Sequence, residues 1–241
     1  MLSVSNIQMR FGGLRVLSGV SFDMDGRGVL GLIGPNGAGK TTLFNILTGF
    51  VRPNEGQVMF GGQAITRLAP ERRAQLGIAR TFQVVRPFAR LTVLDNVMIG
   101  AFIRVATHDE ARLRSLEALE RVGLIDQAER LASALTLPDR KRLELARCLA
   151  TRPRLLLLDE MMCGLNPTEM DQIIALIRML NEEGIAIILV EHIMDAITAL
   201  AHDVIVLDGG EVLARGTPES VLADARVIEA YLGAQVEHAA N

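Results

Sequence analysis

Short runs of aliphatic residues alternate with amphipathic stretches along most of the chain. Near-continuous apolar runs are typical of strands covered on both faces, and they predict parallel strands at residues 29–33, 155–158, 185–190 and 204–207. Apolar residues that recur every three or four positions predict helices at residues 40–47, 110–122, 140–150, 167–181 and 191–200. Strands and helices in alternation predict an α/β core.

The N-terminal third has a different pattern. Residues 2–8, 16–22 and 57–60 alternate apolar and polar positions between short Gly-containing turns, which favours a small antiparallel sheet. Residues 92–150 have almost entirely helical patterns. The predicted fold is therefore an α/β core with an N-terminal antiparallel β lobe and an inserted helical lobe.

Composition narrows the class of protein. The 241 residues are 49% apolar and 22% charged, which is typical of a folded chain rather than a disordered one. The 25 basic and 28 acidic residues give a net charge of −3, so we expect no nucleic-acid partner. No apolar run approaches the roughly 20 residues of a membrane helix, and residues 1–10 lack a signal-peptide core. We therefore expect the chain to stay in the cytosol.

Residues 34–42 carry the most specific motif in the sequence. They fit the pattern GxxxxGK(S/T), follow the strand expected at 29–33 and lead into the helix expected at 40–47, as a phosphate-binding loop does. Glycines let backbone N–H groups surround phosphate oxygens, and the helix N-terminus adds partial positive charge. Lys40 would reach the β- and γ-phosphates, and the Thr41 hydroxyl would bind Mg²⁺. The residues expected to bind nucleotide here are Gly34, Pro35, Asn36, Gly37, Ala38, Gly39, Lys40, Thr41 and Thr42.

Two acidic residues follow the four-leucine strand at 155–158. Asp159 would hold Mg²⁺ through water, and Glu160 would orient or deprotonate the attacking water. Cys163 lies just beyond them, and we expect it to be a small buried residue rather than a reactive thiol. Cys148 and Cys163 have no metal-ligand spacing, so reduced thiols are the expected state.

The order of these motifs resembles the ATP-binding subunit of an ABC transporter, over essentially the whole chain. The resemblance implies a P-loop NTPase core of the ABC nucleotide-binding type, with ATP and Mg²⁺ bound. It also implies three further roles. Gln83 would contact Mg²⁺ and the attacking water, His192 would contact the γ-phosphate, and Phe11 would stack on adenine. Glu160, His192 and Gln83 are then the candidate catalytic residues, and Thr41, Gln83 and Asp159 the candidate metal ligands.

The resemblance also suggests domain bounds. We expect a single ABC ATPase domain over 1–241, with the nucleotide-binding core and β lobe at 1–86 and 151–233. The helical lobe is expected at 87–150, and a C-terminal tail at 234–241.

Three segments are similar to branched-chain amino-acid importers. They are residues 80–83 (RTFQ), 164–167 (GLNP) and 228–233 (IEAYLG). The similarity implies uptake of branched-chain amino acids or a related small polar solute, such as an amide or urea. A lipopolysaccharide-export ATPase has a related tail and is an alternative. Tyr231 in this tail is compatible with either, and a simple core anchor would also explain it.

The resemblance also implies partners for this chain. They are two transmembrane permease subunits, a second ATP-binding subunit that is a sister chain or a copy of this one, and, indirectly, an extracytoplasmic solute-binding protein. The chain would then lie peripherally on the cytoplasmic face of the inner membrane. Residues 84–91 mix apolar and basic side chains after Gln83 and would suit a groove for a permease helix; an ordinary interlobe linker is the alternative.

The ABC signature, usually LSGGQ, is replaced here by LTLPD at residues 135–139. Thr136 keeps a hydroxyl and is retained as a nucleotide contact, while Leu137 and Pro138 replace both glycines. Pro138 has no N–H to donate to phosphate, although it suits the first turn of a helix. A regulatory subunit with weak hydrolysis is therefore a second alternative. A soluble ABC protein acting on ribosomes or DNA is disfavoured, because such proteins usually carry two nucleotide domains or a long coiled coil.

Overall fold

The computed structural model describes residues 1–83 and 86–239. Two compact units make up the chain. The first contains residues 1–70 and the residues from 186 onward, and the second contains residues 71–185. Each unit is described by itself.

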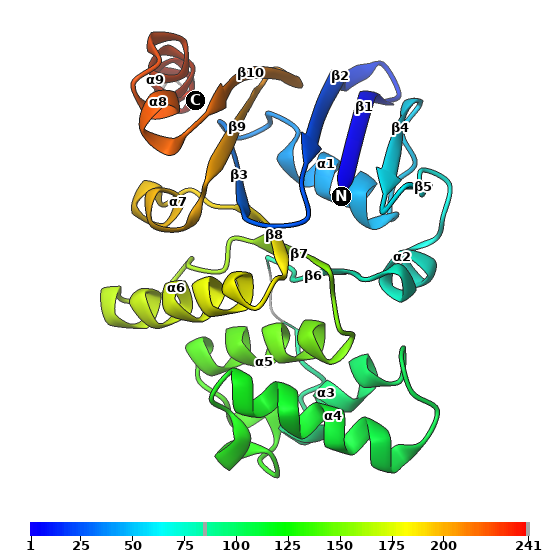
Figure 1. The fold of residues 1–241 in the computed structure, drawn as a ribbon. Coiled ribbons are helices and arrows are strands. Elements are labelled where there is room, and N and C mark those ends of the chain that lie inside the picture. The colour runs from blue at the N-terminus through cyan, green and yellow to red at the C-terminus, as the bar shows by residue number, and fades with distance from the viewer. Residues whose placement is uncertain (84–85, 240–241) are drawn as a thin grey trace. The chain divides into compact units, whose positions relative to one another are not determined.

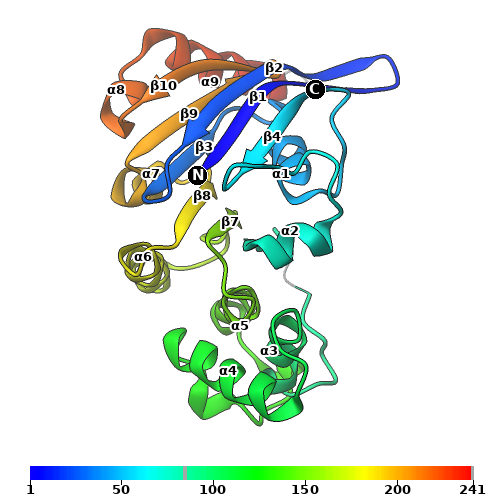
Figure 2. The ribbon, with the colours of Figure 1, turned by 45° about the vertical axis from the view of Figure 1, so that its right-hand side comes forward.

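An antiparallel sheet forms the N-terminal part of the first unit, and β1, β2 and β4 lie side by side in it (Figure 2). Its strands, in the order β2-β1-β4-β5, are β1 (Leu2–Phe11), β2 (Leu14–Met24), β4 (Glu55–Phe60) and β5 (Gln63–Ala64). Burial alternates along parts of β1 and β2, because successive side chains point to opposite faces of the sheet. This confirms the predicted antiparallel β lobe.

Strands of a mixed sheet form another part of the first unit. The central β3 (Val29–Ile33) pairs in parallel with β8 (Ala186–Val190) on one side and β9 (Asp203–Asp208) on the other. β10 (Glu211–Gly216) runs antiparallel beside β9. All five residues of β3 are buried, as a near-continuous apolar run predicts. The two sheets meet where the Ser18 N–H donates to the Gly210 carbonyl at 2.9 Å.

Four helices of the described chain complete this unit. They are α1 (Lys40–Thr48), α7 (Met194–Leu200), α8 (Pro218–Leu222) and α9 (Ala225–Ala239). α1 packs against β2, and α8 and α9 lie beside β10 (Figure 1). α1 begins directly after Gly39 and ends before Gly49, both in left-handed conformations that favour glycine. The phosphate-loop pattern is therefore followed at once by a helix, as the sequence predicted.

The second unit combines a short parallel strand pair with helices. β6 (Ile78–Arg80) pairs with β7 (Leu155–Asp159), which is buried throughout. The helices α3, α4 and α5 pack against one another. The helices and turns are α2 (Pro70–Leu76), α3 (Val93–Ala101), α4 (His108–Arg121), η1 (Ile125–Gln127), η2 (Ala132–Ala134), α5 (Leu137–Ala150) and α6 (Pro167–Glu182). The predicted α/β class is confirmed.

Three local predictions were wrong. The helix expected at 191–200 begins at Met194, because the chain bends at His192 after β8 and Ile193 has an extended backbone. The helix expected at 140–150 begins at Leu137, because Thr136 caps it and Pro138 fits its first turn. Cys163 is exposed rather than buried, since it follows the turn that Glu160 makes with a φ of +51° after β7. Both cysteines are free thiols, as expected. The domain bounds drawn from the sequence stay predictions.

Among the described residues, no helix combines the length and the apolar character needed to cross a membrane.

Close approach of α3 to α5 makes Gly100 a sensitive position. A Cβ there would lie 2.4 Å from the Arg147 carbonyl oxygen. Gly100→Ala should therefore lower the free energy of unfolding by about 1–3 kcal/mol, the usual cost of overpacking. Urea denaturation measures it. Gly13→Ala is the control, because a Cβ there meets nothing within 4 Å, and it should change the value by less than about 0.5 kcal/mol. Equal stability of both variants would show that the helices are not packed this closely.

Candidate functional site

The phosphate-loop segment leaves the end of β3 and enters α1. Gly34 has a φ of +146°, and a Cβ there would lie 2.0 Å from the Leu207 carbonyl oxygen of β9. Gly39 has a φ of +102°, and its Cβ would lie 2.6 Å from Leu17 Cδ2. Both positions therefore require glycine, and together they fix the path of the loop.

Lys40 folds back over this loop. Its amine donates to the carbonyl oxygens of Gly34 at 2.7 Å and Pro35 at 2.9 Å. Among the residues that the structure describes, no side chain caps the N-terminus of α1, where Thr41 is exposed. An uncapped helix N-terminus presents N–H groups and partial positive charge to an anion. Asn36 and Gly37 at the loop tip are exposed as well, so the loop has the chemistry of a phosphate site.

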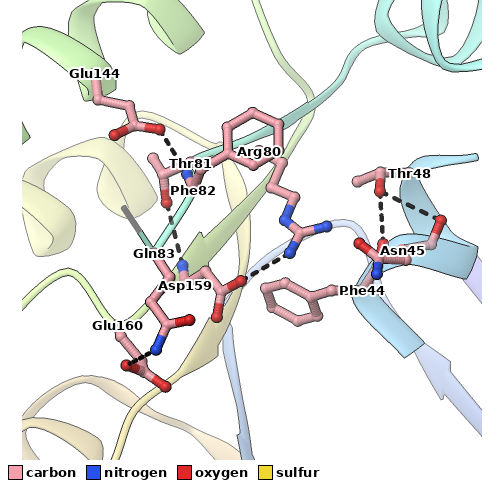
Figure 3. Close-up of polar contacts among 10 residues, drawn as sticks. All are labelled: Phe44, Asn45, Thr48, Arg80, Thr81, Phe82, Gln83, Glu144, Asp159 and Glu160. Carbon is pink, nitrogen blue, oxygen red and sulfur yellow. Dashed lines mark hydrogen bonds and ion pairs between the residues drawn. The ribbon is translucent and has the colours of Figure 1, made fainter. Parts of the chain in front are cut away.

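A buried ion pair stands at the end of β7 in the second unit (Figure 3). The Arg80 guanidinium lies 2.8 Å from the Asp159 carboxylate, and the two side chains are 7% and 5% exposed. The Asp159 N–H donates to the Thr81 hydroxyl at 3.1 Å. Arg80 also lies over the Phe82 ring, with its guanidinium carbon 5.3 Å from the ring centroid. Thus Asp159 is held in place and its charge is compensated.

Gln83 and Glu160 are brought together in the same unit. The Gln83 side-chain amide donates to the Glu160 carboxylate at 2.6 Å (Figure 3). The Lys141 amine donates to the Glu160 carbonyl oxygen at 3.2 Å. Glu160 has a φ of +51°, which is uncommon for a residue with a Cβ, and such conformations cluster at functional sites. Gln83 thus orients the partly exposed carboxylate of Glu160, while Lys141 holds the backbone of the same residue.

Sequence reasoning missed Glu144. This α5 residue is 5% exposed, and one of its carboxylate oxygens accepts the Phe82 N–H at 2.5 Å (Figure 3). Burial raises the pKa of the Glu144 carboxyl, and the Phe82 hydrogen bond opposes that rise. An acidic residue within a helix whose adjacent positions are apolar is the signal that could have found it. Glu144 fixes the backbone next to Gln83.

The segment that replaces the ABC signature is a helix cap. The Thr136 hydroxyl accepts the Asp139 N–H and donates to the Asp139 carboxylate at 3.0 Å. Leu137 and Pro138 form the first turn of α5. The hydroxyl and the first turn are thus engaged within the helix itself.

The remaining predicted residues divide between the units. Phe11 ends β1 and is exposed, and His192 is exposed in the loop between β8 and α7; both belong to the first unit with the phosphate loop. Gln83, Thr136, Asp159 and Glu160 belong to the second. Of the segment 84–91, residues 84 and 85 lie outside the described residues. Phe88 in that segment is exposed, and the Arg147 guanidinium lies over its ring.

Oxygen donors dominate the candidate metal ligands. Thr41 offers a hydroxyl, Asp159 a carboxylate and Gln83 an amide oxygen, and Mg²⁺ prefers such oxygens. In the described part of the chain, no three His, Cys, Asp or Glu side chains form a group that could hold a metal ion. Each of these donors therefore suits magnesium chemically, as an ion that takes further ligands from substrate phosphates and water.

Comparison with known families bears on the same segments. The family model described as "ABC transporter" matches residues 17–162. The model described as "Branched-chain amino acid ATP-binding cassette transporter" matches residues 211–237. The first match includes the phosphate loop and the β7 carboxylates, and the second includes Tyr231.

Curated relatives align over nearly the whole chain. The high-affinity branched-chain amino acid transport ATP-binding protein LivG of Escherichia coli is 39% identical over 97% of this chain and 98% of its own. The corresponding protein BraF of Pseudomonas aeruginosa is 40% identical over 96% and 97%. The lipopolysaccharide export system ATP-binding protein LptB of Haemophilus influenzae is 34% identical over 97% and 98%.

Solved structures agree with the fold. An ATP-binding cassette of an ABC transporter in its ADP conformation superposes with a TM-score of 0.88 at 31% identity, covering 97% of this chain and 98% of that one. A bacterial ABC transporter cassette in dimeric form has a TM-score of 0.81 at 26% identity, covering 90% and 99%.

Glu144 gives the second unit a specific pH dependence. Because its pKa is raised on folding, the folded state holds this proton more tightly than the unfolded chain does. The contribution of Glu144 to the free energy of unfolding is therefore greatest below the ordinary glutamate pKa of 4.5, and it falls as pH rises above that value. Glu144→Gln removes this loss, so its melting temperature relative to wild type should rise from pH 4.5 to about pH 7.5.

The exposed Glu120 on α4 provides the control, because its Gln variant should show no such trend. A melting-temperature difference that stays flat or falls for Glu144→Gln would contradict the assignment.

Proposed function

Since the chain belongs to the ABC transporter family, whose cassettes are ATPases coupled to transport, we propose that it is the ATP-binding and ATP-hydrolysing subunit of an importer. The solute is a branched-chain amino acid or a related small polar molecule, as the names of its relatives LivG and BraF suggest. The observation that carries the proposal is the uncapped N-terminus of α1 behind a glycine-constrained loop, with the Lys40 amine within it.

Nucleotide binding follows from that loop. Backbone N–H groups of residues 36–42 and the positive end of α1 attract phosphate oxygens. Lys40 exchanges its two carbonyl partners for the β- and γ-phosphates, which are stronger acceptors because they are charged. Phe11, exposed at the end of β1, stacks on adenine. Gly34 to Thr42 and Phe11 together form the ATP site.

Hydrolysis depends on the carboxylates at β7. Glu160, oriented by the Gln83 amide, takes a proton from the attacking water. His192 donates to the γ-phosphate and stabilises the charge that develops there. Thr41, Asp159 and Gln83 would hold Mg²⁺, which neutralises phosphate charge when bound. Asp159 would serve that role from the position in which Arg80 holds its carboxylate.

The family's architecture supplies the partners. A second ATP-binding subunit, a copy or a sister chain, completes each site with its own signature segment. Two permease subunits, engaged at residues 84–91, which include the exposed Phe88, couple hydrolysis to transport, and a solute-binding protein delivers the solute. The chain thus works peripherally on the cytoplasmic face of the membrane.

A weakly hydrolysing regulatory subunit is the second candidate. The Thr136 cap and Pro138 in the first turn of α5 favour it, because they remove donors that a partner's γ-phosphate would use. The pairing of Gln83 with Glu160 favours an active site instead. A lipopolysaccharide-export role has the weaker support, since LptB is 34% identical against 39% for LivG.

Catalysis is tested in vesicles that contain the chain with its permease partners. Glu160→Gln should abolish ATP-driven leucine uptake and ATP turnover but leave ATP binding intact, because the carboxylate acts on water. Lys40→Ala should lose ATP affinity instead, since the amine acts on phosphate. Wild-type turnover in the Glu160→Gln transporter would remove Glu160 from its role, and ATP turnover without uptake of any branched-chain amino acid, amide or urea would refute the importer assignment.

The altered signature predicts asymmetry between two sites. If the partner is a sister chain with an intact signature, ATP on Lys40 has full contacts, while ATP on the sister meets residues 136–139. One lost hydrogen bond to a charged group, worth about 1.5–3 kcal/mol, slows turnover roughly 10- to 160-fold if the loss falls on the transition state.

Single-turnover counting of ATP cleaved per complex measures this asymmetry, with Glu160→Gln here compared with the matched variant of the sister. The Lys40 site should carry most of the hydrolysis. The prediction would be contradicted if both ATP molecules of a complex were cleaved at the same rate. It would also be contradicted if the native assembly were a homodimer, because both sites would then be identical.

A further inference from the structure

The C-terminal helix α9 reaches the first residue of the phosphate loop. The Gly34 N–H donates to the Tyr231 hydroxyl oxygen at 2.8 Å. These residues are 197 positions apart in the sequence, and both belong to the first unit. α9 lies beside β10 (Figure 1), and its start is fixed by Asp224, whose carboxylate accepts the Arg226 N–H at 2.9 Å. A segment outside the known nucleotide motifs thus contacts the loop directly.

Gly34 needs an acceptor at this point. It is buried and follows the last residue of β3, and its α-carbon is pressed against the Leu207 carbonyl, as the 2.0 Å approach of a Cβ shows. A buried N–H without an acceptor is costly, and the backbone here has no freedom to turn toward another. The phenol oxygen of Tyr231 satisfies the donor while the loop keeps its path.

The same residue also contacts Lys40. The Gly34 carbonyl accepts the Lys40 amine at 2.7 Å, so Gly34 is held by Tyr231 on one side and by Lys40 on the other. When Lys40 turns to phosphate, Tyr231 remains as the side chain that holds Gly34. Burial raises the pKa of the Tyr231 phenol above its usual value near 10, so the hydroxyl stays neutral at physiological pH.

We propose that Tyr231 is a positioning residue for the phosphate loop, through which the C-terminal helix sets the affinity for nucleotide. This inference rests on the proposed ATP binding and deepens it. Tyr231 touches neither the phosphates nor the water; it acts by accepting the Gly34 N–H and so holding the start of the loop. Anything that displaces α9 therefore weakens ATP binding without changing the chemical step.

The full-length chain offers a sharp test with Tyr231→Phe, which removes only the hydroxyl. ATP and ADP affinities should fall roughly 2- to 12-fold, the worth of one neutral hydrogen bond. In the assembled transporter, KM for ATP should rise by the same factor while kcat stays unchanged. Leu232→Ala is the matched control, because the neighbouring side chain is 58% exposed, and its affinity should equal that of wild type.

A second measurement needs no substitution, because the chain contains a single tyrosine. Tyr231 is the single tyrosine of the chain, so biosynthetic 3-fluorotyrosine labels this position alone. Its fluorine lies beside the hydroxyl, and the ¹⁹F resonance should shift when ATP binds and Lys40 leaves the Gly34 carbonyl. AMP at the same concentration should leave the resonance in place.

Wild-type affinity in Tyr231→Phe would overturn the proposal. If that variant fails to fold, an unmoved ¹⁹F resonance at saturating ATP overturns it instead, and a shifted one supports it. A wild-type chain that binds no ATP would be a different result, since it refutes the proposed function and this inference with it.

Discussion

The backbone at Gly34 is the constraint on which the phosphate loop and the start of α1 depend. β9 approaches so closely that a Cβ would lie 2.0 Å from the Leu207 carbonyl oxygen, and the φ of +146° favours glycine as well. Because the chain must turn away from the sheet at this residue, α1 can begin six positions later with Lys40 in its first turn. The N–H groups, the lysine amine and the helix dipole that a phosphate needs all take their positions from that turn.

Charge compensation is the second principle of the site. Asp159 is paired with Arg80, Glu160 accepts the Gln83 amide, and Glu144 accepts the Phe82 N–H. Burying carboxylates is costly, and these donors offset part of the cost while fixing each oxygen in place. The same donors fix the carboxylates to which the proposed function assigns metal binding and proton transfer: Arg80 holds Asp159, and Gln83 holds Glu160.

Local signals in the sequence predicted the parts of the site that lie within one motif. The glycine spacing before Lys40 predicted the loop that leads into α1, and the leucine run before Asp159 predicted the strand that ends there. Each pattern was sufficient because the motif and the structure it forms span the same few residues. Contacts between distant segments left no such signal: Tyr231 meets Gly34 across 197 positions, and Arg80 meets Asp159 across 79. The prediction of the helix start at Met194 was also wrong, since amphipathic periodicity does not report that residues 191–193 form a loop.

The central claim is that the loop from Gly34 to Lys40 recognises the β- and γ-phosphates of a nucleotide. Equilibrium titration of the full-length chain with ATP, ADP and AMP tests it most directly. The account predicts one site per chain for ATP and ADP, and AMP weaker than ADP by roughly 100-fold or more, because two charge-assisted hydrogen bonds to the β-phosphate are lost. AMP binding as tightly as ADP, or ATP failing to bind, would contradict the account.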